Sequence, residues 1–461
     1  MMNSIIKKTI LFLIIIVLNT SLFSQTTDSI VIKKIYSAAL TNDIAYNNLE
    51  YLCKKIGARI AGSPQAAAAV EWTKQLLQNM DIDNVYTEEL WVHRWDRGEK
   101  EYCKVVSPLF GTQELTICAL GESIGTGPTG INAEIIEVKN FDDLKKLGKK
   151  KIKGKIIFFN RPMDATLFNT FEAYGGAVDQ RFSGASEAAK YGAIGVIVRS
   201  LTTNIDEFPH TGIMRYTEGT PKIPAVAVCT KDAELLSQWL QSDPKLKVYI
   251  KTNCQFYPEV KSCNVIGEIK GSKYPDEFIM VGGHIDSWDL GEGAQDDGVG
   301  CMQSIEVLRL FKSLGIKPKH SIRVVIFMDE EIAQRGGQKH KDLVELKNEK
   351  IIAAIESDGG GFIPTGFSID ASEEKILKLK EWIKLFENYG MHQVDVGWGG
   401  IDIDPLKELN IPLIGLETSS QRYFDYQHSA KDTFDKVNKR EMQLGSAAMA
   451  ALIYLIDQYG L

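Results

Sequence analysis

The stretch from residue 284 to residue 298 holds side chains that could bind zinc. His284 is followed by Asp286, and the pair Asp296-Asp297 stands before Gly298, a residue typical of turns. Imidazole nitrogens and carboxylate oxygens are good zinc ligands, and a ligating histidine usually donates its second ring N–H to a carboxylate or a carbonyl. We therefore expect His284 and Asp296 to bind metal and Asp286 to orient the imidazole of His284.

Three further clusters supply groups of the same kind. They are Glu330-Glu331, Asp358, and His428 with Asp432 four residues later. The carboxylates of Asp296, Glu331 and Asp358, together with one bridging hydroxide, balance the charge of two Zn²⁺ ions. A single zinc would leave excess negative charge in a confined site, which is costly. The sequence therefore predicts two Zn²⁺ per chain, bound by His284, Asp296, Glu331, Asp358 and His428.

Glu330 and Glu331 are adjacent, so their side chains point in different directions. One can bind metal while the other acts as a general base, and we assign the base to Glu330. Two metals about 3.5–4 Å apart are the arrangement that aminopeptidases use to activate water and polarise a carbonyl group. Alone, an Asp-Asp-Gly sequence is most often a turn. The clusters taken together favour a dinuclear centre in which Asp286, Asp297 and Asp432 lie beside the ligands and orient them.

Predicted strands and helices alternate after residue 264. Expected strands at 278–281, 322–328 and 351–355 are followed by His284, by Glu330-Glu331 and by Asp358, and helices are expected at 298–314 and 337–346. This alternation predicts an α/β fold with a doubly wound, mainly parallel sheet. Such sheets bind ligands at the carboxyl ends of their strands, which is where the candidate zinc ligands fall.

The pattern changes between residues 119 and 250, where glycine-rich turns separate short strands and helices. We expect an inserted domain there, with residues 25–118 and 251–461 forming the domain that carries the candidate ligands. At the N-terminus, Lys7 and Lys8 precede an apolar run at 10–18 and then small or polar residues, which is the order of a secretory signal peptide over 1–24. The alternative is an uncleaved membrane anchor. We expect a secreted or periplasmic protein with no membrane association after cleavage.

Composition excludes some classes of function. The formal net charge is -7 over 461 residues, and no basic stripe is present that would favour nucleic acid binding. The seven cysteines are too few and too scattered for a disulfide scaffold in a chain of this size. Cys254 and Cys263 could form a disulfide across a hairpin, and buried free thiols are at least as well supported.

The chain resembles the co-catalytic zinc aminopeptidase/glutamate carboxypeptidase family, and within it the branch of carboxypeptidase Q, also called plasma glutamate carboxypeptidase. The motifs that carry the resemblance are His-x-Asp-Ser at 284–287, Gly-Ala-Gln-Asp-Asp-Gly at 293–298, Glu-Glu at 330–331, Glu-Ser-Asp-Gly-Gly at 356–360 and His428 with Asp432-Thr433. The segments 284–291 and 209–213 are similar to the carboxypeptidase Q branch in particular. The likeness covers nearly the whole chain after residue 24.

The resemblance implies how the site is divided. One zinc would be bound by His284, Asp296 and Asp358 and the other by Asp296, Glu331 and His428, with a cis peptide after Asp296. It also implies that 119–250 is a protease-associated domain covering the active site, and that the protein forms a homodimer. Ile332-Ala333 departs from the smaller or polar residues usual in the family, and Gln427 stands where the carboxypeptidase Q branch has a second histidine.

We therefore expect an exported dizinc exopeptidase acting on dipeptides or short peptides as a dipeptidase or carboxypeptidase. An aminopeptidase is the alternative within the same class, because the zinc ligands do not distinguish the two ends of a peptide. A glutaminyl-cyclase-like enzyme with one zinc, or a binding protein without activity, is the alternative from other classes. The presence of all five ligands and of Glu330 argues against both.

Overall fold

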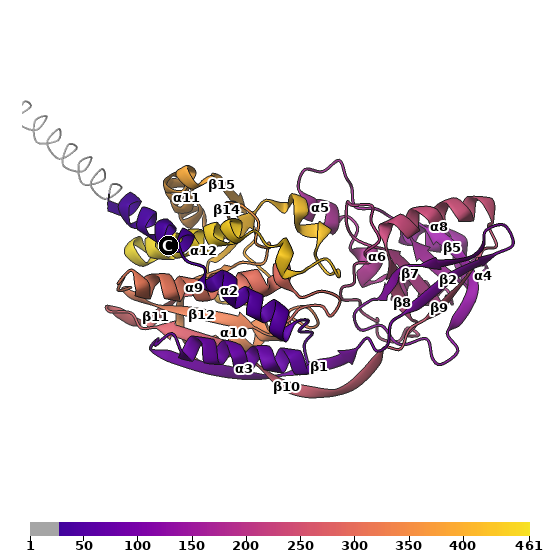
Figure 1. The fold of residues 1–461 in the computed structure, drawn as a ribbon, viewed down its shortest axis with the longest axis horizontal. Helices are drawn as coiled ribbons and strands as arrows, with labels where there is room; N and C mark the ends of the chain where they lie inside the picture. Colours follow the sequence, from indigo (N-terminus) through magenta and orange to yellow (C-terminus); the bar gives the residue numbers. More distant parts are fainter. Residues whose placement is uncertain (1–26) are drawn as a thin grey trace, which may run out of the picture.

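The structure is a computed structural model that describes residues 27–461. The signal peptide expected at 1–24 lies outside the described residues. Two eight-stranded sheets form the two lobes of an elongated molecule (Figure 1). The larger lobe is built around the first sheet, and the second sheet lies at the opposite end of the long axis.

The first sheet contains the strands on which the candidate ligands depend. Its order is β1 (Asn84–Asp96), β10 (Gln255–Ile269), β12 (His320–Phe327), β11 (Tyr274–His284), β13 (Lys350–Glu356), β16 (Leu413–Thr418), β14 (Pro364–Asp370) and β15 (Gln393–Val396). The central strands β12, β11, β13 and β16 are parallel, whereas β1, β10 and β14 each pair antiparallel with a neighbour. The α/β fold is confirmed, but the sheet is mixed: β14 and β15 at its edge are also parallel to each other, and antiparallel pairs separate the parallel strands from β1 and from β14.

The second sheet is also mixed. Its order is β3 (Gly111–Leu115), β2 (Tyr102–Ser107), β9 (Lys247–Lys251), β5 (Ile131–Val138), β6 (Ile156–Phe159), β7 (Gly195–Arg199), β8 (Ala225–Val228) and β4 (Ile117–Ala119). The hairpin of β2 and β3 precedes residue 119, yet it belongs to this sheet because β2 pairs with β9. The sheet therefore extends from 102 to 251, somewhat beyond the segment 119–250 that we expected as an insertion.

The helices fall into two sets that follow the two sheets. Around the first sheet they are a helix over 27–40, α2 (Ile44–Tyr51), α3 (Pro64–Gln78), α9 (Val299–Ser313), α10 (Arg335–Lys347), α11 (Glu373–Trp382) and α12 (Lys439–Tyr459). Within the other lobe they are α4 (Phe141–Ile152), α5 (Thr170–Gly175), α6 (Asp179–Phe182), α7 (Gly184–Lys190) and α8 (Thr230–Ser242). Short helical turns are η1 (Leu52–Ile56), η2 (Ala294–Gly298), η3 (Ile383–Leu385), η4 (Glu387–Tyr389), η5 (Asp404–Leu409), η6 (Ser420–Asp425) and η7 (Phe434–Lys436).

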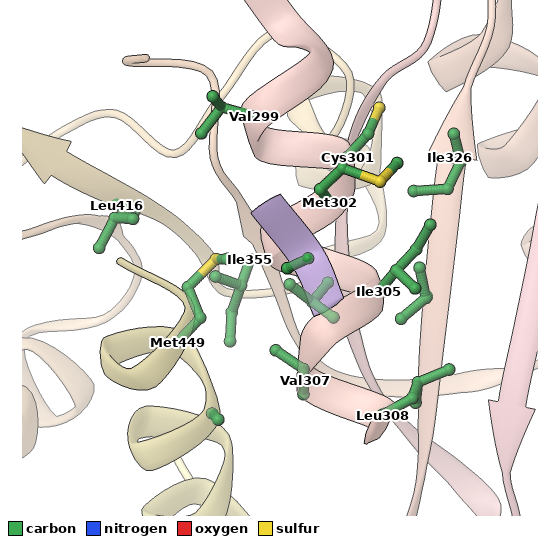
Figure 2. Packing of buried hydrophobic residues seen from close by; sticks show 14 of the residues in the cluster. Val299, Cys301, Met302, Ile305, Val307, Leu308, Ile326, Ile355, Leu416 and Met449 are labelled. Atoms are coloured by element: carbon green, nitrogen blue, oxygen red, sulfur yellow. The ribbon is translucent and has the colours of Figure 1, made fainter. Parts of the chain in front are cut away.

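Alternating side chains of the central strands supply two hydrophobic clusters. On β12, Val324 and Ile326 belong to the larger cluster, which includes residues of α2, α9 and α12. Val325 and Phe327 belong to a smaller cluster that includes residues of α10 and η5. Because both faces of β12 are covered here, Val324 to Phe327 are apolar at every position rather than alternating. Figure 2 shows the larger cluster, in which Leu308, Ile305 and Met302 project from α9 among residues of the sheet and α12.

The local sequence explains where α3 begins. Ser63 caps α3 by accepting a hydrogen bond from the Ala66 N–H, and Pro64 occupies the first turn. All seven cysteines are free, so the disulfide considered for Cys254 and Cys263 is wrong. Cys254 directly precedes β10 and Cys263 lies on it nine positions later, so the extended chain separates them by about 30 Å, far beyond the reach of a disulfide.

Among residues 27–461, none of the helices combines the length and the apolar character that a membrane crossing requires.

Leu308 provides a test of the core. It is fully buried on α9, so Leu308→Ala removes buried methyl groups and leaves a cavity, and we expect a loss of about 2–5 kcal/mol in the free energy of unfolding. Leu346→Ala is the matched control, because that leucine is 80% exposed on α10. Urea denaturation followed by tryptophan fluorescence measures both. Equal effects of the two substitutions would contradict this packing.

Candidate metal centre

The candidate ligands meet at the carboxyl edge of the parallel strands. His284 is the last residue of β11, Glu330 and Glu331 follow β12, and Asp358 follows β13. The register places His284 beside Phe327, the last residue of β12, so neighbouring strands end at the same level. Asp296 lies in η2 and His428 just after η6, which add ligand-type groups from outside the sheet.

Two groups of side chains share Asp296. His284 Nε2 lies 3.3 Å from Asp296 Oδ1 and 3.5 Å from Asp358 Oδ1. His428 Nε2 lies 3.2 Å from Asp296 Oδ2 and 3.1 Å from Glu331 Oε2. The structure thus brings together all five residues that the sequence analysis singled out, with one oxygen of Asp296 directed to each imidazole. We refer to these as the His284 group and the His428 group.

Both groups fit metal cations. Buried polar atoms normally have hydrogen-bond partners, and unpaired ones are costly. In these groups four buried atoms have none: His284 Nε2, Asp296 Oδ2, Glu331 Oε1 and Asp358 Oδ1. A cavity of about 10 Å³, the size of one water molecule, lies against Asp296, Glu331 and His428. Imidazole nitrogen and carboxylate oxygen in this number are what zinc binds in catalytic sites.

The carboxylates carry more negative charge than buried groups hold easily without cations. Burial raises the pKa of Glu331 to about 7, although His428 opposes the shift. Burial also raises the pKa of Asp358 and, well above its usual value, that of Glu330. Asp296 is the exception: despite its burial, the adjacent imidazoles of His284 and His428 lower its pKa. Bound cations would lower the pKa values of the other carboxylates in the same way.

Asp286 has a different role from the one we expected. Its carboxylate accepts backbone N–H bonds from Asp329 at 2.8 Å and from Glu330 and Glu331 at 3.2 Å each, so it holds the turn that carries the two glutamates. Its Oδ1 is 3.9 Å from His284 Nδ1. The ring of His284 is oriented instead by the backbone carbonyl of Asp286, at 3.0 Å from Nδ1.

Asp432 likewise holds backbone rather than an imidazole. It accepts the N–H of Gln295 at 2.7 Å and of Asp296 at 3.2 Å, which fixes the turn that carries Asp296. The expectation that it orients His428 is not met, because the backbone donors of η2 occupy its carboxylate. The Nδ1 atom of His428 lies 3.5 Å from Nη1 of Arg181.

Asp297 completes this set of carboxylates. It accepts the N–H of His284 at 3.2 Å and of Gly300 at 3.0 Å, and the Asp296–Asp297 peptide is cis, as the resemblance implied. Asp297 also lies close enough to His284 and Asp358 to be considered a ligand. Both oxygens of Asp297 accept backbone N–H groups, whereas Asp296 Oδ2 has no hydrogen-bond partner.

Arg59 is a residue that sequence reasoning missed. Its guanidinium is fully buried and donates to the carbonyls of Ile285, Glu292 and Gly293 at 2.7, 2.6 and 2.8 Å. It therefore ties together both ends of the loop between His284 and Asp296. No local signal identifies it, since an arginine near a helix end is ordinarily solvated.

Segments of the other lobe also reach the site. The His210 ring donates from Nδ1 to the carbonyl of Gln427 at 2.7 Å, and the Thr211 N–H donates to the carbonyl of His428 at 2.9 Å. Burial lowers the pKa of His210 to about 4, so this imidazole is neutral. The segment 209–213, noted in the sequence only as a likeness, thus packs directly beside the His428 group.

Comparison with known proteins agrees with this geometry. The family model described as peptidase family M28 matches residues 264–453. Carboxypeptidase Q of Bos taurus is 33% identical over 434 residues, covering 94% of this chain and 89% of that protein. A peptidase M28 precursor of Shewanella amazonensis superposes with a TM-score of 0.89 at 32% identity, covering 94% of this chain and 97% of the other.

A more distant structure shares the fold. The zinc aminopeptidase of Bacillus subtilis superposes with a TM-score of 0.64 at 20% identity, covering 89% of this chain and 94% of the other. The identity and coverage of the carboxypeptidase Q relatives confirm the resemblance drawn from the motifs. The chain therefore belongs to peptidase family M28, and it is a peptide hydrolase of the metallo-exopeptidase kind.

Proposed function

We propose that the protein is a two-zinc exopeptidase that hydrolyses dipeptides or other short peptides. The observation that carries this proposal is the pair of histidine–carboxylate groups that share Asp296. His284, Asp296 and Asp358 would hold one zinc, and Asp296, Glu331 and His428 the other. Zinc, when bound, would supply the positive charge that polarises a peptide carbonyl. It would also lower the pKa of water, so that hydroxide is available to attack that carbonyl.

Glu330 is the proposed general base. Its Oε2 lies 3.9 Å from His284 Nε2, at the edge of the His284 group, while its neighbour Glu331 faces His428. Burial raises the pKa of Glu330, which makes it a better proton acceptor than an exposed glutamate. The carboxylate would take a proton from the attacking water and deliver it to the nitrogen of the leaving amine. Asp286 supports this role by fixing the Glu330 backbone.

Short substrates are favoured because the other lobe packs against the site. Arg181, His210 and Thr211 all contact His428 or its neighbour Gln427. A site bordered on this side has less room for a long polypeptide than an open one. We assign the region centred on 119–250 to a protease-associated domain that covers the active site, with its sheet extending from 102 to 251.

Action at the carboxyl end of the substrate, or on dipeptides, is supported by the name of the relatives at 33–34% identity, carboxypeptidase Q. An aminopeptidase is the second candidate, because a relative of Bacillus subtilis at 24% identity over 245 residues bears the name aminopeptidase YwaD. A glutaminyl-cyclase-like or non-catalytic member is disfavoured by the presence of Glu330 and of both complete groups. We further propose export directed by residues 1–24, no membrane association after cleavage, and a homodimer.

Glu330→Gln tests the base. The amide cannot accept the proton, so we expect kcat to fall by about 10²–10⁴-fold while zinc content stays at the wild-type level. Glu374→Gln, an exposed position on α11, is the control and should keep full activity. Turnover of a dipeptide and metal analysis of the same samples measure both effects. Wild-type turnover by Glu330→Gln would refute the assignment.

Zinc removal tests the metal requirement. A strong chelator should abolish hydrolysis, and the buried carboxylates left without cations should lower the melting temperature. Addition of zinc should restore both properties, with activity reaching its maximum at two equivalents per chain. A maximum at one equivalent would favour the cyclase-like alternative, and activity retained without metal would exclude the proposed mechanism.

Blocked substrates decide which terminus is read. A free dipeptide, its N-acetylated form and its C-amidated form are compared at equal concentration. Carboxypeptidase action predicts that the acetylated form is cleaved and the amidated form is not. The reverse pattern would identify an aminopeptidase, and cleavage of the free dipeptide alone a dipeptidase.

A further inference from the structure

The two candidate metal groups differ in what faces the second ring nitrogen of each histidine. We infer that Arg181 makes the His428 group the weaker of the two zinc sites, so that the His284 group fills first. This inference rests on the proposed two-zinc function. It concerns a residue that is not a ligand and that comes from α6, in the lobe that carries the second sheet.

The imidazole of His284 is arranged for metal. Its Nδ1 lies 3.0 Å from the carbonyl of Asp286, an atom that can only accept, so the ring proton is on Nδ1. Nε2 then presents its lone pair between the carboxylates of Asp296 and Asp358 and has no hydrogen-bond partner. Zinc binding at this group needs no rearrangement of the ring proton, and the hydrogen bond from Nδ1 is kept.

The imidazole of His428 is arranged differently. Its Nδ1 lies 3.5 Å from Nη1 of Arg181, which can only donate. This contact favours the tautomer with the proton on Nε2, the atom that faces Asp296 and Glu331 at 3.2 and 3.1 Å. Zinc binding through Nε2 moves that proton to Nδ1. There it meets an N–H of Arg181 instead of an acceptor, so the contact is lost.

Charge adds to this effect. Arg181 is buried, and its hydrogen bonds go to the Thr211 carbonyl at 3.4 Å and the Tyr174 hydroxyl at 2.5 Å, while Nε has no partner. Its positive charge is therefore not offset by a bonded carboxylate, and it repels a cation bound on the far side of the imidazole. Nearby Gly212 keeps the contact close: a Cβ there would lie 2.5 Å from Arg181 Cζ and 2.7 Å from His428 Nδ1.

The two groups offer the same kinds of ligand. Each has one imidazole, one carboxylate of its own and one oxygen of the shared Asp296. Glu330 and Asp297 lie beside the His284 group and also favour a cation there, so the environment of the second ring nitrogen is one of two differences between the groups. In metal sites, changing the partner of a ligating histidine typically alters metal affinity by about 10–100-fold.

The experiment measures zinc affinity directly, independent of activity. Metal-free protein is titrated with zinc in competition with a chromogenic chelator, which gives the two dissociation constants. Wild type should show one tight and one weaker zinc, separated by about tenfold or more. Crystals grown with one zinc per chain should show the anomalous signal of zinc beside His284 and Asp358. Two equal constants, or a first zinc beside Glu331, would overturn the inference.

Substitutions at position 181 assign the difference to the guanidinium. Arg181→Gln removes the charge and offers an amide oxygen to Nδ1–H, so the weaker zinc should tighten by about tenfold or more while the tight one is unchanged. Arg181→Lys keeps the charge and should keep the weak site. Arg199→Gln is the matched control, a buried arginine of the same lobe that is bonded to Asn160 and Glu234.

The outcomes separate this inference from the proposed function. Wild-type protein that binds no zinc would refute the two-zinc enzyme itself. Wild-type protein with two zinc ions and activity, but with no tightening in Arg181→Gln, would refute only the role of Arg181. Thermal melts of each variant establish that it folds, and the wild-type titration tests the unequal affinities whether or not a variant folds.

Discussion

The site depends on buried carboxylates that accept hydrogen bonds from backbone N–H groups. Asp286, Asp297 and Asp432 are nearly or fully buried, and each holds a segment that carries a candidate ligand. Asp286 fixes the turn of Glu330 and Glu331, Asp297 fixes His284, and Asp432 fixes Asp296. Burial raises the pKa of each of the three aspartates, and the backbone donors oppose that shift. Among the candidate ligands, Glu331 and Asp358 retain oxygens without such donors, and these are available to a metal.

This division explains how so many acids share a small volume. Burial disfavours ionised carboxylates, and each one must be paired or hydrogen-bonded. Asp432 is paired with two N–H groups, whereas Glu331 and Asp358 retain oxygens with no partner. Asp329, Glu356 and Asp402 add further unpaired oxygens in the same part of the fold. Arg59 provides the rigidity for this arrangement by fixing the loop between His284 and Asp296.

The sequence predicted the candidate ligands but not the contacts around them. His284, Glu331 and Asp358 could be grouped because each follows an apolar strand, and parallel strands end at one edge of a sheet. The roles of Asp286 and Asp432 could not be read, because a carboxylate near a histidine in sequence need not face its ring. Arg59 and Arg181 come from distant segments, and their positions follow from tertiary packing. The antiparallel pairs of β1, β10 and β14 were not predicted, because they depend on long-range pairing, which local patterns do not reveal.

The paired strands β1 and β10 connect the two lobes (Figure 1). The chain leaves the first sheet after Asp96 and returns at Gln255, and these two residues are direct partners in the antiparallel ladder. Everything between them, including Arg181 and the segment 209–213, therefore enters and leaves at one point. A tight turn joining Asp96 to Gln255 would close a simple hairpin and leave the first sheet intact. In evolutionary terms, residues 97–254 form an insertion that can be gained, exchanged or lost without altering the hydrogen bonding of the sheet that presents His284.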